Sequence, residues 1–134
     1  MKTENADSLF PIAINAVVLD CKDPSVLSDF YVRLLGWKKE PDNEDEEFVG
    51  IFSPAGNIRI LFQKNEDYVS PVWPEEPGKQ QQMTHLDFIV KDKKQMGLAV
   101  RHAVSCGASK ADVQYSDHWT VMIDPAGHPF CFII

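Results

Sequence analysis

Asp124-Pro125-Ala126-Gly127, close to the C-terminus, has an earlier counterpart in Ser53-Pro54-Ala55-Gly56. Both stretches follow another glycine at the same distance, because Gly36 and Gly107 each lie 20 residues before the glycine of the turn. Self-similarity at a nearly fixed offset is a signal of fold. The sequence therefore predicts two copies of one structural module.

Each half of the chain reads as a strand, a helix and three further strands. Asp23 and Asp92 can cap the two helices, and Gly36 and Gly107 can end them. Between these limits, apolar residues recur at helical spacing. The predicted strands are residues 12–21, 37–40, 47–53 and 57–64 in the first half and 84–90, 111–114, 119–123 and 129–134 in the second.

Two segments fall outside the repeat. Residues 40–47 contain six acidic residues among eight, which is typical of a solvated hairpin tip. Residues 68–82 contain three prolines, and proline excludes a continuous helix, so we expect an extended linker there. The chain is thus predicted to be a single α+β domain over residues 1–134, with module one at 12–67, the linker at 68–82 and module two at 83–134.

The composition narrows the classes of function. The 134 residues include 13 Lys and Arg against 20 Asp and Glu, for a net charge of −7, which argues against nucleic-acid binding and against adhesion to anionic membranes. Residues 1–11 lack the apolar stretch of a signal peptide. The three cysteines show neither zinc-knuckle nor disulfide spacing. We therefore expect a cytoplasmic protein.

Several motifs resemble the small bacterial glyoxalase-like domains of the vicinal oxygen chelate superfamily, which includes glyoxalases, bleomycin resistance proteins and dioxygenases. The motifs are Val18–Pro24, Phe30-Tyr31, Leu35-Gly36-Trp37, Trp73-Pro74, His85–Val90 and Asp124–Cys131. The resemblance covers about residues 12–134. It implies two tandem βαβββ modules that form a paired half-barrel with a shared cleft, and a homodimer. This superfold hosts many reactions, so function has to be argued from the site.

The resemblance also implies a metal site, with a His or Gln seven residues before each capping Asp and a Glu four residues after each turn glycine. In the second module these positions hold His85 and Cys131, and in the first they hold Ala16 and Ile60, or Leu61 if the strand is displaced by one residue. A His/Cys pair favours zinc, but catalytic zinc usually has three protein ligands. We expect no complete metal site; the alternative is a divalent ion (Zn, Ni or Mn) at low occupancy.

The strand period indicates which side chains face the cleft. His85, Asp87 and Ile89 share one face of their strand, and the alternating apolar residues from Leu86 to Val90 share the other. The apolar face should pack under the helices, so His85 and Asp87 should point into the cleft. A carboxylate beside an imidazole stabilises the imidazolium, and in a dry pocket such a pair suits proton transfer. On an open surface it is an ordinary polar face.

Four other residues are candidates for binding a substrate, in addition to Cys131. Arg59 and Gln63 would enter the cleft from the first module, where Arg59 could clamp a carboxylate or phosphate; the alternative is a solvent-facing arginine. Trp73 and Trp119 are flat amphipathic side chains that can line a pocket. We expect Trp73 to be a pocket wall or lid, and Trp119 to be partly in the core.

Three functions remain open. The first is the binding of a small organic molecule in the cleft, as in bleomycin resistance proteins, without a complete metal site. The alternative is a lyase or isomerase of the glyoxalase-like type that uses His85 and Asp87 for proton transfer, with or without a weakly held divalent metal. The third is a dimeric interaction module without catalysis.

Overall fold

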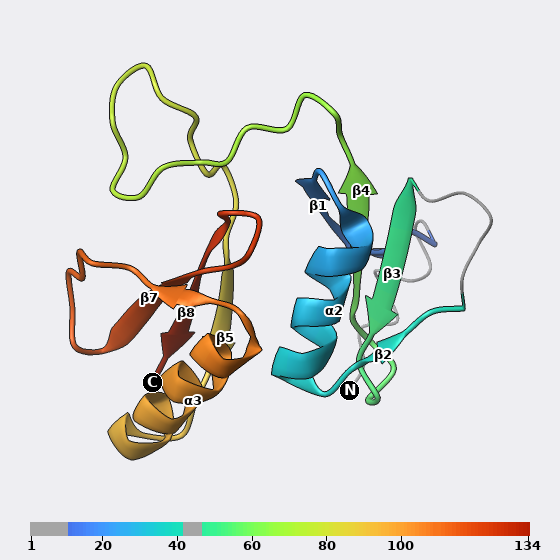
Figure 1. Ribbon diagram of the computed structural model, residues 1–134. Coiled ribbons are helices and arrows are strands. Elements are labelled where there is room, and N and C mark those ends of the chain that lie inside the picture. Colours follow the sequence, from blue (N-terminus) through green and yellow to red (C-terminus); the bar gives the residue numbers. More distant parts are fainter. Residues whose placement is uncertain (1–10, 42–46) are drawn as a thin grey trace.

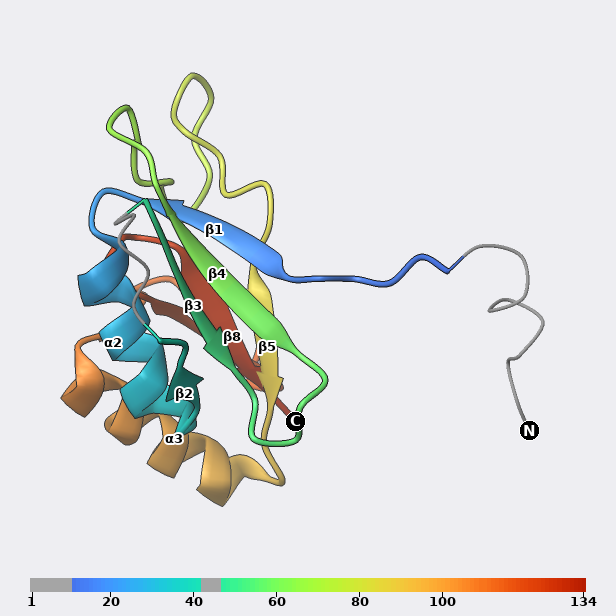
Figure 2. The same cartoon turned by 90° about the vertical axis from the view of Figure 1, so that its right-hand side faces the viewer.

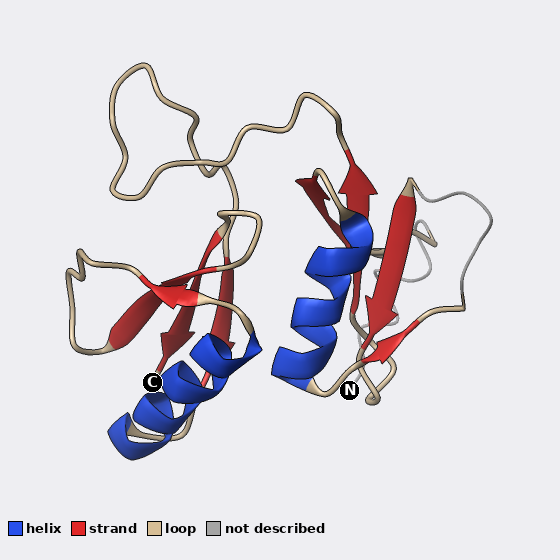
Figure 3. Cartoon of the chain, viewed as in Figure 1, coloured by secondary structure: helices blue, strands red, loops and turns tan. Residues whose placement is uncertain are grey.

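The computed structural model describes residues 11–41 and 47–134, which form two four-stranded sheets with one helix each (Figures 1 and 3). The strand orders are β1-β4-β3-β2 and β5-β8-β7-β6. In the first sheet β1 pairs with β4 in parallel, and in the second β5 pairs with β8 in parallel. The predicted α+β fold of two βαβββ modules is therefore confirmed. The elements are β1 (Val17–Cys21), α2 (Pro24–Leu35), β2 (Lys38–Lys39), β3 (Phe48–Phe52), β4 (Arg59–Lys64), β5 (Leu86–Ile89), α3 (Lys93–Cys106), β6 (Ser109–Lys110), β7 (Trp119–Ile123) and β8 (Pro129–Ile133).

The helices begin and end at the predicted residues. The carboxylate of Asp23 accepts hydrogen bonds from the backbone N–H groups of Ser25 and Val26 at 3.1 and 3.2 Å, which satisfies donors left free at a helix start. Asp92 caps α3 in the same way. Gly36 ends α2 with a φ of 69°, a left-handed conformation that favours glycine.

The two Pro-Ala-Gly turns share their hydrogen bonds as well as their sequence. In the first, Ser53 Oγ accepts from the N–H of Ala55 at 3.1 Å. In the second, Asp124 Oδ1 accepts from the N–H of Ala126 at 2.8 Å. In both turns the glycine N–H donates to the carbonyl of the first residue. The repeat therefore extends to the level of single side chains.

Two predicted strands differ from the observed ones. β1 begins at Val17, where pairing with Ile60 of β4 starts, and residues 11–16 run away from the sheet as an extended segment (Figure 2). The strand predicted at 111–114 is instead β6, Ser109–Lys110. The side chain of Gln114 explains the shift, because it bonds the backbone of Ala111 and Val121 and so replaces strand pairing. Residues 42–46 of the predicted acidic tip lie outside the described residues.

The main core lies between the two modules. Helices α2 and α3 lie side by side (Figures 1 and 2). Phe30 and Tyr31 of α2 meet Phe130 of β8 with ring centroids 6.0 and 6.1 Å apart, and Tyr31 stacks on Phe62 of β4 at 5.5 Å. One face of each sheet packs into this core; we call the other its open face. Neither helix is long and apolar enough to cross a membrane, within the residues described.

Candidate functional site on the second sheet

Three side chains meet on the open face of the second sheet. His85 directly precedes β5, Asp87 lies within it, and Cys131 of β8 is the register partner of Asp87. His85 Nε2 lies 3.3 Å from Asp87 Oδ1. Together with Cys131 Sγ, the three ligand atoms lie within 4.8 Å of one another. The predicted cleft residues of the second module are thus brought together.

The environment of these three groups differs sharply. The side chains of His85 and Asp87 are 44% and 50% exposed, whereas Cys131 is 8% exposed. Burial raises the pKa of the Cys131 thiol to about 11, and the negative charge of Asp87 and a hydrogen bond to it act in the same direction. The thiol is therefore protonated at neutral pH. The group offers an imidazole and a carboxylate to solvent above a shielded sulfur.

Trp73 forms an apolar wall beside this group. It packs against a small cluster of Ala111, Val121 and Cys131, and its indole N–H donates to the carbonyl of Val113 at 3.0 Å. The ring of Tyr115 meets it edge-on at 5.7 Å. The linker thus folds back onto the second sheet, and the role of Trp73 as a pocket wall or lid stays a prediction.

Trp119 is more exposed than we predicted. It is 38% exposed because it is the first residue of β7, at the end of the sheet, where it pairs with Ile133. The alternation of the strand places it on the same open face as Val121. Trp119 is therefore available at the surface and is not a core residue.

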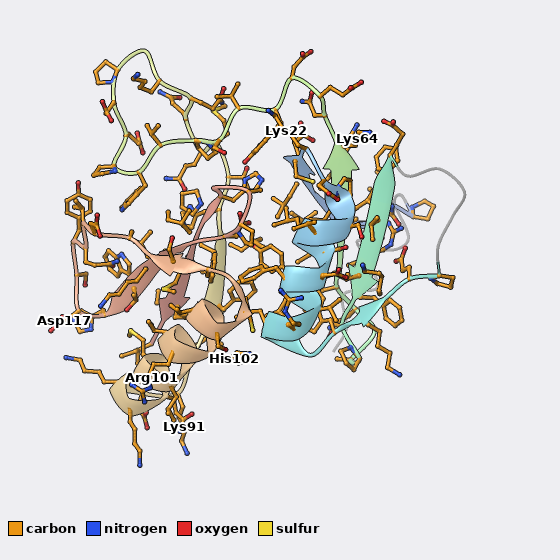
Figure 4. The ribbon with its side chains drawn as sticks, viewed as in Figure 1. Lys22, Lys64, Lys91, Arg101, His102 and Asp117 are labelled. Atoms are coloured by element: carbon orange, nitrogen blue, oxygen red, sulfur yellow. The ribbon has the colours of Figure 1, made fainter. Side chains whose placement is uncertain are left out.

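Arg59 and Gln63 lie on the first sheet, apart from the group on the second. Arg59 is not free, because its guanidinium bonds both carboxylate oxygens of Glu40. This pairing lowers the pKa of Glu40 and raises that of Arg59. Both residues line a cavity of about 790 Å³ in the first module, whose rim also includes Lys22 and Lys64 at the ends of β1 and β4 (Figure 4).

Sequence reasoning missed a polar contact that joins the modules. The Tyr31 hydroxyl donates to Asp124 Oδ2 at 2.7 Å, and the other oxygen accepts from the N–H groups of Ala126 and His128. Burial raises the pKa of Asp124. The position of Asp124 at the start of the Asp-Pro-Ala-Gly turn marked it as a structurally constrained residue. The sequence did not indicate its partner, because Tyr31 lies 93 residues away.

Two histidines whose partners the sequence does not indicate also bridge the modules. His128 Nε2 lies 2.6 Å from the carbonyl oxygen of Asp20. His102 Nε2 lies 3.0 Å from the carbonyl oxygen of Leu34, on the side of α3 that faces α2 (Figure 4). Each ring nitrogen therefore has a backbone acceptor in the neighbouring module. These two contacts therefore link the modules in addition to the shared core.

The four-ligand metal site that the resemblance implies does not fit this chain. Ile60 is buried in the core at 2% exposure, and Ala16 and Leu61 offer no ligand atom. Within residues 11–41 and 47–134, the group of three potential ligand atoms that lie close together belongs to the second module and comes from His85, Asp87 and Cys131. A set of nitrogen, oxygen and sulfur suits zinc better than Mg²⁺ or Ca²⁺, which prefer oxygen.

The comparisons with known proteins agree on the family. Residues 16–133 match the glyoxalase-like domain family. A search of curated proteins finds no match.

Solved structures of glyoxalase and antibiotic resistance proteins are similar to this chain over most of their length. A glyoxalase/bleomycin resistance protein/dioxygenase family enzyme from Burkholderia phytofirmans PsJN is 19% identical, with a TM-score of 0.66 over 87% of this chain and 94% of that one. A possible glyoxalase from Bacillus cereus is 12% identical, with a TM-score of 0.66 over 92% and 99%. A fosfomycin resistance protein from Mesorhizobium loti is 10% identical, with a TM-score of 0.63 over 90% of both chains. At such identities the likeness shows the fold alone.

Proposed function

The chain belongs to the glyoxalase-like domain family of the vicinal oxygen chelate superfamily, and on that premise we propose that it binds a small organic molecule on the open face of its second sheet. One observation carries this proposal: Trp73 packs beside Cys131, next to the exposed polar pair of His85 and Asp87. A flat apolar group can lie against Trp73 and Trp119, while a cationic or hydrogen-bonding group meets Asp87. This binding needs no metal.

A ligand screen by thermal shift in the presence of a chelator tests the proposal. A ligand at 100 times its Kd stabilises the folded protein by about 2.7 kcal/mol, so a binder should raise the Tm clearly. Trp73→Phe should weaken the response, whereas the matched control Trp37→Phe, which alters a tryptophan packed against the main core, should leave it unchanged. The proposal would be contradicted if no ligand of a broad panel shifted the Tm of the wild type. It would also be contradicted if a ligand shifted the Tm of Trp73→Phe and of Trp37→Phe equally.

The second candidate is an enzyme of the lyase or isomerase kind. It is favoured by the 3.3 Å contact between His85 Nε2 and Asp87 Oδ1, a geometry in which the imidazole can take a proton while the carboxylate orients it. The half-exposed pair gains a dry environment only when a ligand covers it. The test is exchange of a carbon-bound proton next to a carbonyl for deuterium in D₂O. His85→Ala should abolish the exchange and His118→Ala should not.

We also propose that the protein is a cytoplasmic homodimer. The outer strands β1 and β5 are sheet edges, which proteins usually cover, and they carry the exposed apolar residues Val18 and Ile89 at 46% and 82% exposure. The three cysteines are free thiols, which supports a reducing compartment. Light scattering should give twice the chain mass at micromolar concentration, and Ile89→Lys should shift the protein toward monomer. A monomeric wild-type protein would contradict the dimer.

A further inference from the structure

A basic groove runs between α3 and the edge of the second sheet, in a chain whose net charge is −7. One wall is α3, with Lys93 and Arg101, and the other is Lys110 of β6 with the loop before β7, which carries Asp117 (Figure 4). The cavity has a volume of about 470 Å³. Its lining therefore holds three cations against one carboxylate.

The groove lies on the other side of the sheet from the candidate site described above. Lys110 is the register partner of Met122, which is fully buried in the core. Cys131 of the candidate site pairs instead with Val121, and neighbouring residues of a strand point to opposite faces. The sheet therefore separates the two places, and binding in the groove is independent of the function proposed for the open face.

Two of the three cations are free to bind an anion. Lys93 Nζ pairs with Asp117 Oδ2 at 3.2 Å, and this contact lowers the pKa of Asp117. The exposed side chains of Arg101 and Lys110 have no ion pair or hydrogen bond with residues 11–41 or 47–134. A guanidinium binds phosphate or carboxylate oxygens through two parallel N–H groups, and an ammonium adds a point charge.

Gly97 leaves the floor of the groove open. It lies within α3, where glycine is the least favourable residue except proline. A Cβ at this position would meet only Arg101 Nη1 among the described side chains, at an ordinary contact distance of 3.8 Å, so packing does not require glycine. A longer side chain would occupy the groove itself. Met96 and Val100 border the same cavity and provide apolar surface beside the cations.

We propose that this groove binds a small phosphate monoester, with Arg101 and Lys110 contacting the phosphate oxygens from opposite walls. A phosphate monoester carries about −1.5 to −2 charges at pH 7, which matches two unpaired cations, whereas a carboxylate carries one. The volume of the groove lies in the range of about 300–1,000 Å³ that is typical of small-molecule sites. Met96 and Val100 contact the organic part of the ligand.

Titration of the full chain with phenyl phosphate, by calorimetry at constant ionic strength, tests the proposal. We expect one phenyl phosphate to bind per chain, and benzoate to bind at least about tenfold more weakly, or about 1.4 kcal/mol. Arg101→Gln and Lys110→Gln should each weaken phenyl phosphate binding at least about tenfold, because each removes a charged hydrogen-bond donor. The matched control Lys91→Gln removes the same charge at an exposed position outside the cavity, and it should leave the affinity unchanged.

Gly97→Leu tests the space above the helix. Leucine is a better helix former than glycine, so the Tm should not fall, while the new side chain fills the groove and phenyl phosphate binding should be lost. The proposal is overturned if phenyl phosphate does not bind saturably, if benzoate binds as tightly, or if Lys91→Gln weakens binding as much as Arg101→Gln. Full binding by Gly97→Leu would overturn it as well. Trp73→Phe, on the opposite face, should not change the affinity for phenyl phosphate.

Discussion

Arg59 illustrates how one glycine can decide the role of a charged side chain. Its partner Glu40 lies over Gly50 of β3, and a Cβ at Gly50 would come within 2.6 Å of Glu40 Cδ. The strand can hold the ion pair on its open face only because position 50 has no side chain. Arg59 is therefore an internal partner of Glu40, and the substrate clamp that we predicted would require this pair to open.

Gly50→Ala should displace the Glu40 carboxylate and break the Arg59 pair. Because this pair is about one-third exposed, the loss should be below about 1 kcal/mol. In a Glu40→Ala background the new methyl group meets no carboxylate, so Gly50→Ala should be less costly there. Urea unfolding of the two single variants and the double variant measures this coupling. Strictly additive effects would contradict the steric account.

Alternation along a strand made the residues of the second open face predictable. Leu86 and Phe88 pack against the core while Asp87 and Ile89 are exposed, as the two-residue period requires. Cys131 is placed by the family resemblance, which puts a ligand four residues after the turn glycine. In contrast, no local pattern joins Tyr31 to Asp124, because long-range pairing depends on how the modules pack, and the sequence does not encode that in a period.

At the scale of elements, hydrogen bonds fix the start of the linker to the second module. The hydroxyl groups of Tyr68 and Ser70 both donate to the carbonyl of Ala126, at 2.6 and 2.8 Å. The turn approaches so closely that a Cβ at Gly127 would lie 2.7 Å from Ser70 Cβ. This contact directs the linker toward the second sheet, where Trp73 reaches the candidate site. The sequence predicted an extended linker but not the face that it covers.

Gly127→Ala should destabilise the protein more than Gly56→Ala, its counterpart in the first module. Both glycines have positive φ, 95° and 84°, so each variant has a backbone cost of about 1–3 kcal/mol. A Cβ at Gly56 meets nothing within 4 Å, so only Gly127→Ala also displaces Ser70. In a Ser70→Gly background the two costs should become similar by urea unfolding. An unchanged difference would contradict the contact.

At the scale of the whole molecule, the repeat predicts two modules, and the shared core makes them one unit. Aromatic rings from α2, β4 and β8 fill the space between the sheets, so neither module buries its apolar face alone. We therefore expect residues 1–134 to unfold as the single predicted domain, in one cooperative transition. Coincident urea transitions by circular dichroism and tryptophan fluorescence would support this, and two separated transitions would contradict it.

The buried contact between Tyr31 and Asp124 should make the stability of this unit depend on pH. Because burial raises the pKa of Asp124 above its usual 3.8, the folded protein holds a proton that the unfolded chain has already released. The free energy of unfolding should therefore fall as pH rises from about 4 through the raised pKa. The Asn side chain of Asp124→Asn cannot ionise. The free energy of unfolding of this variant minus that of the wild type should therefore be larger at pH 7 than at pH 4.

Tyr31→Phe tests the same contact from the other module. It removes the hydroxyl that donates to Asp124 while the aromatic packing is retained, so it should destabilise the protein by about 1–3 kcal/mol. The cost should be larger at pH 7 than at pH 4, because a hydrogen bond to an ionised carboxylate is stronger than one to a neutral carboxyl. Urea unfolding of both variants at the two pH values measures these differences. If the cost of Tyr31→Phe did not change with pH, the carboxylate would have the same charge at both values, and Asp124 would not be the group that links protonation to the packing of the two modules.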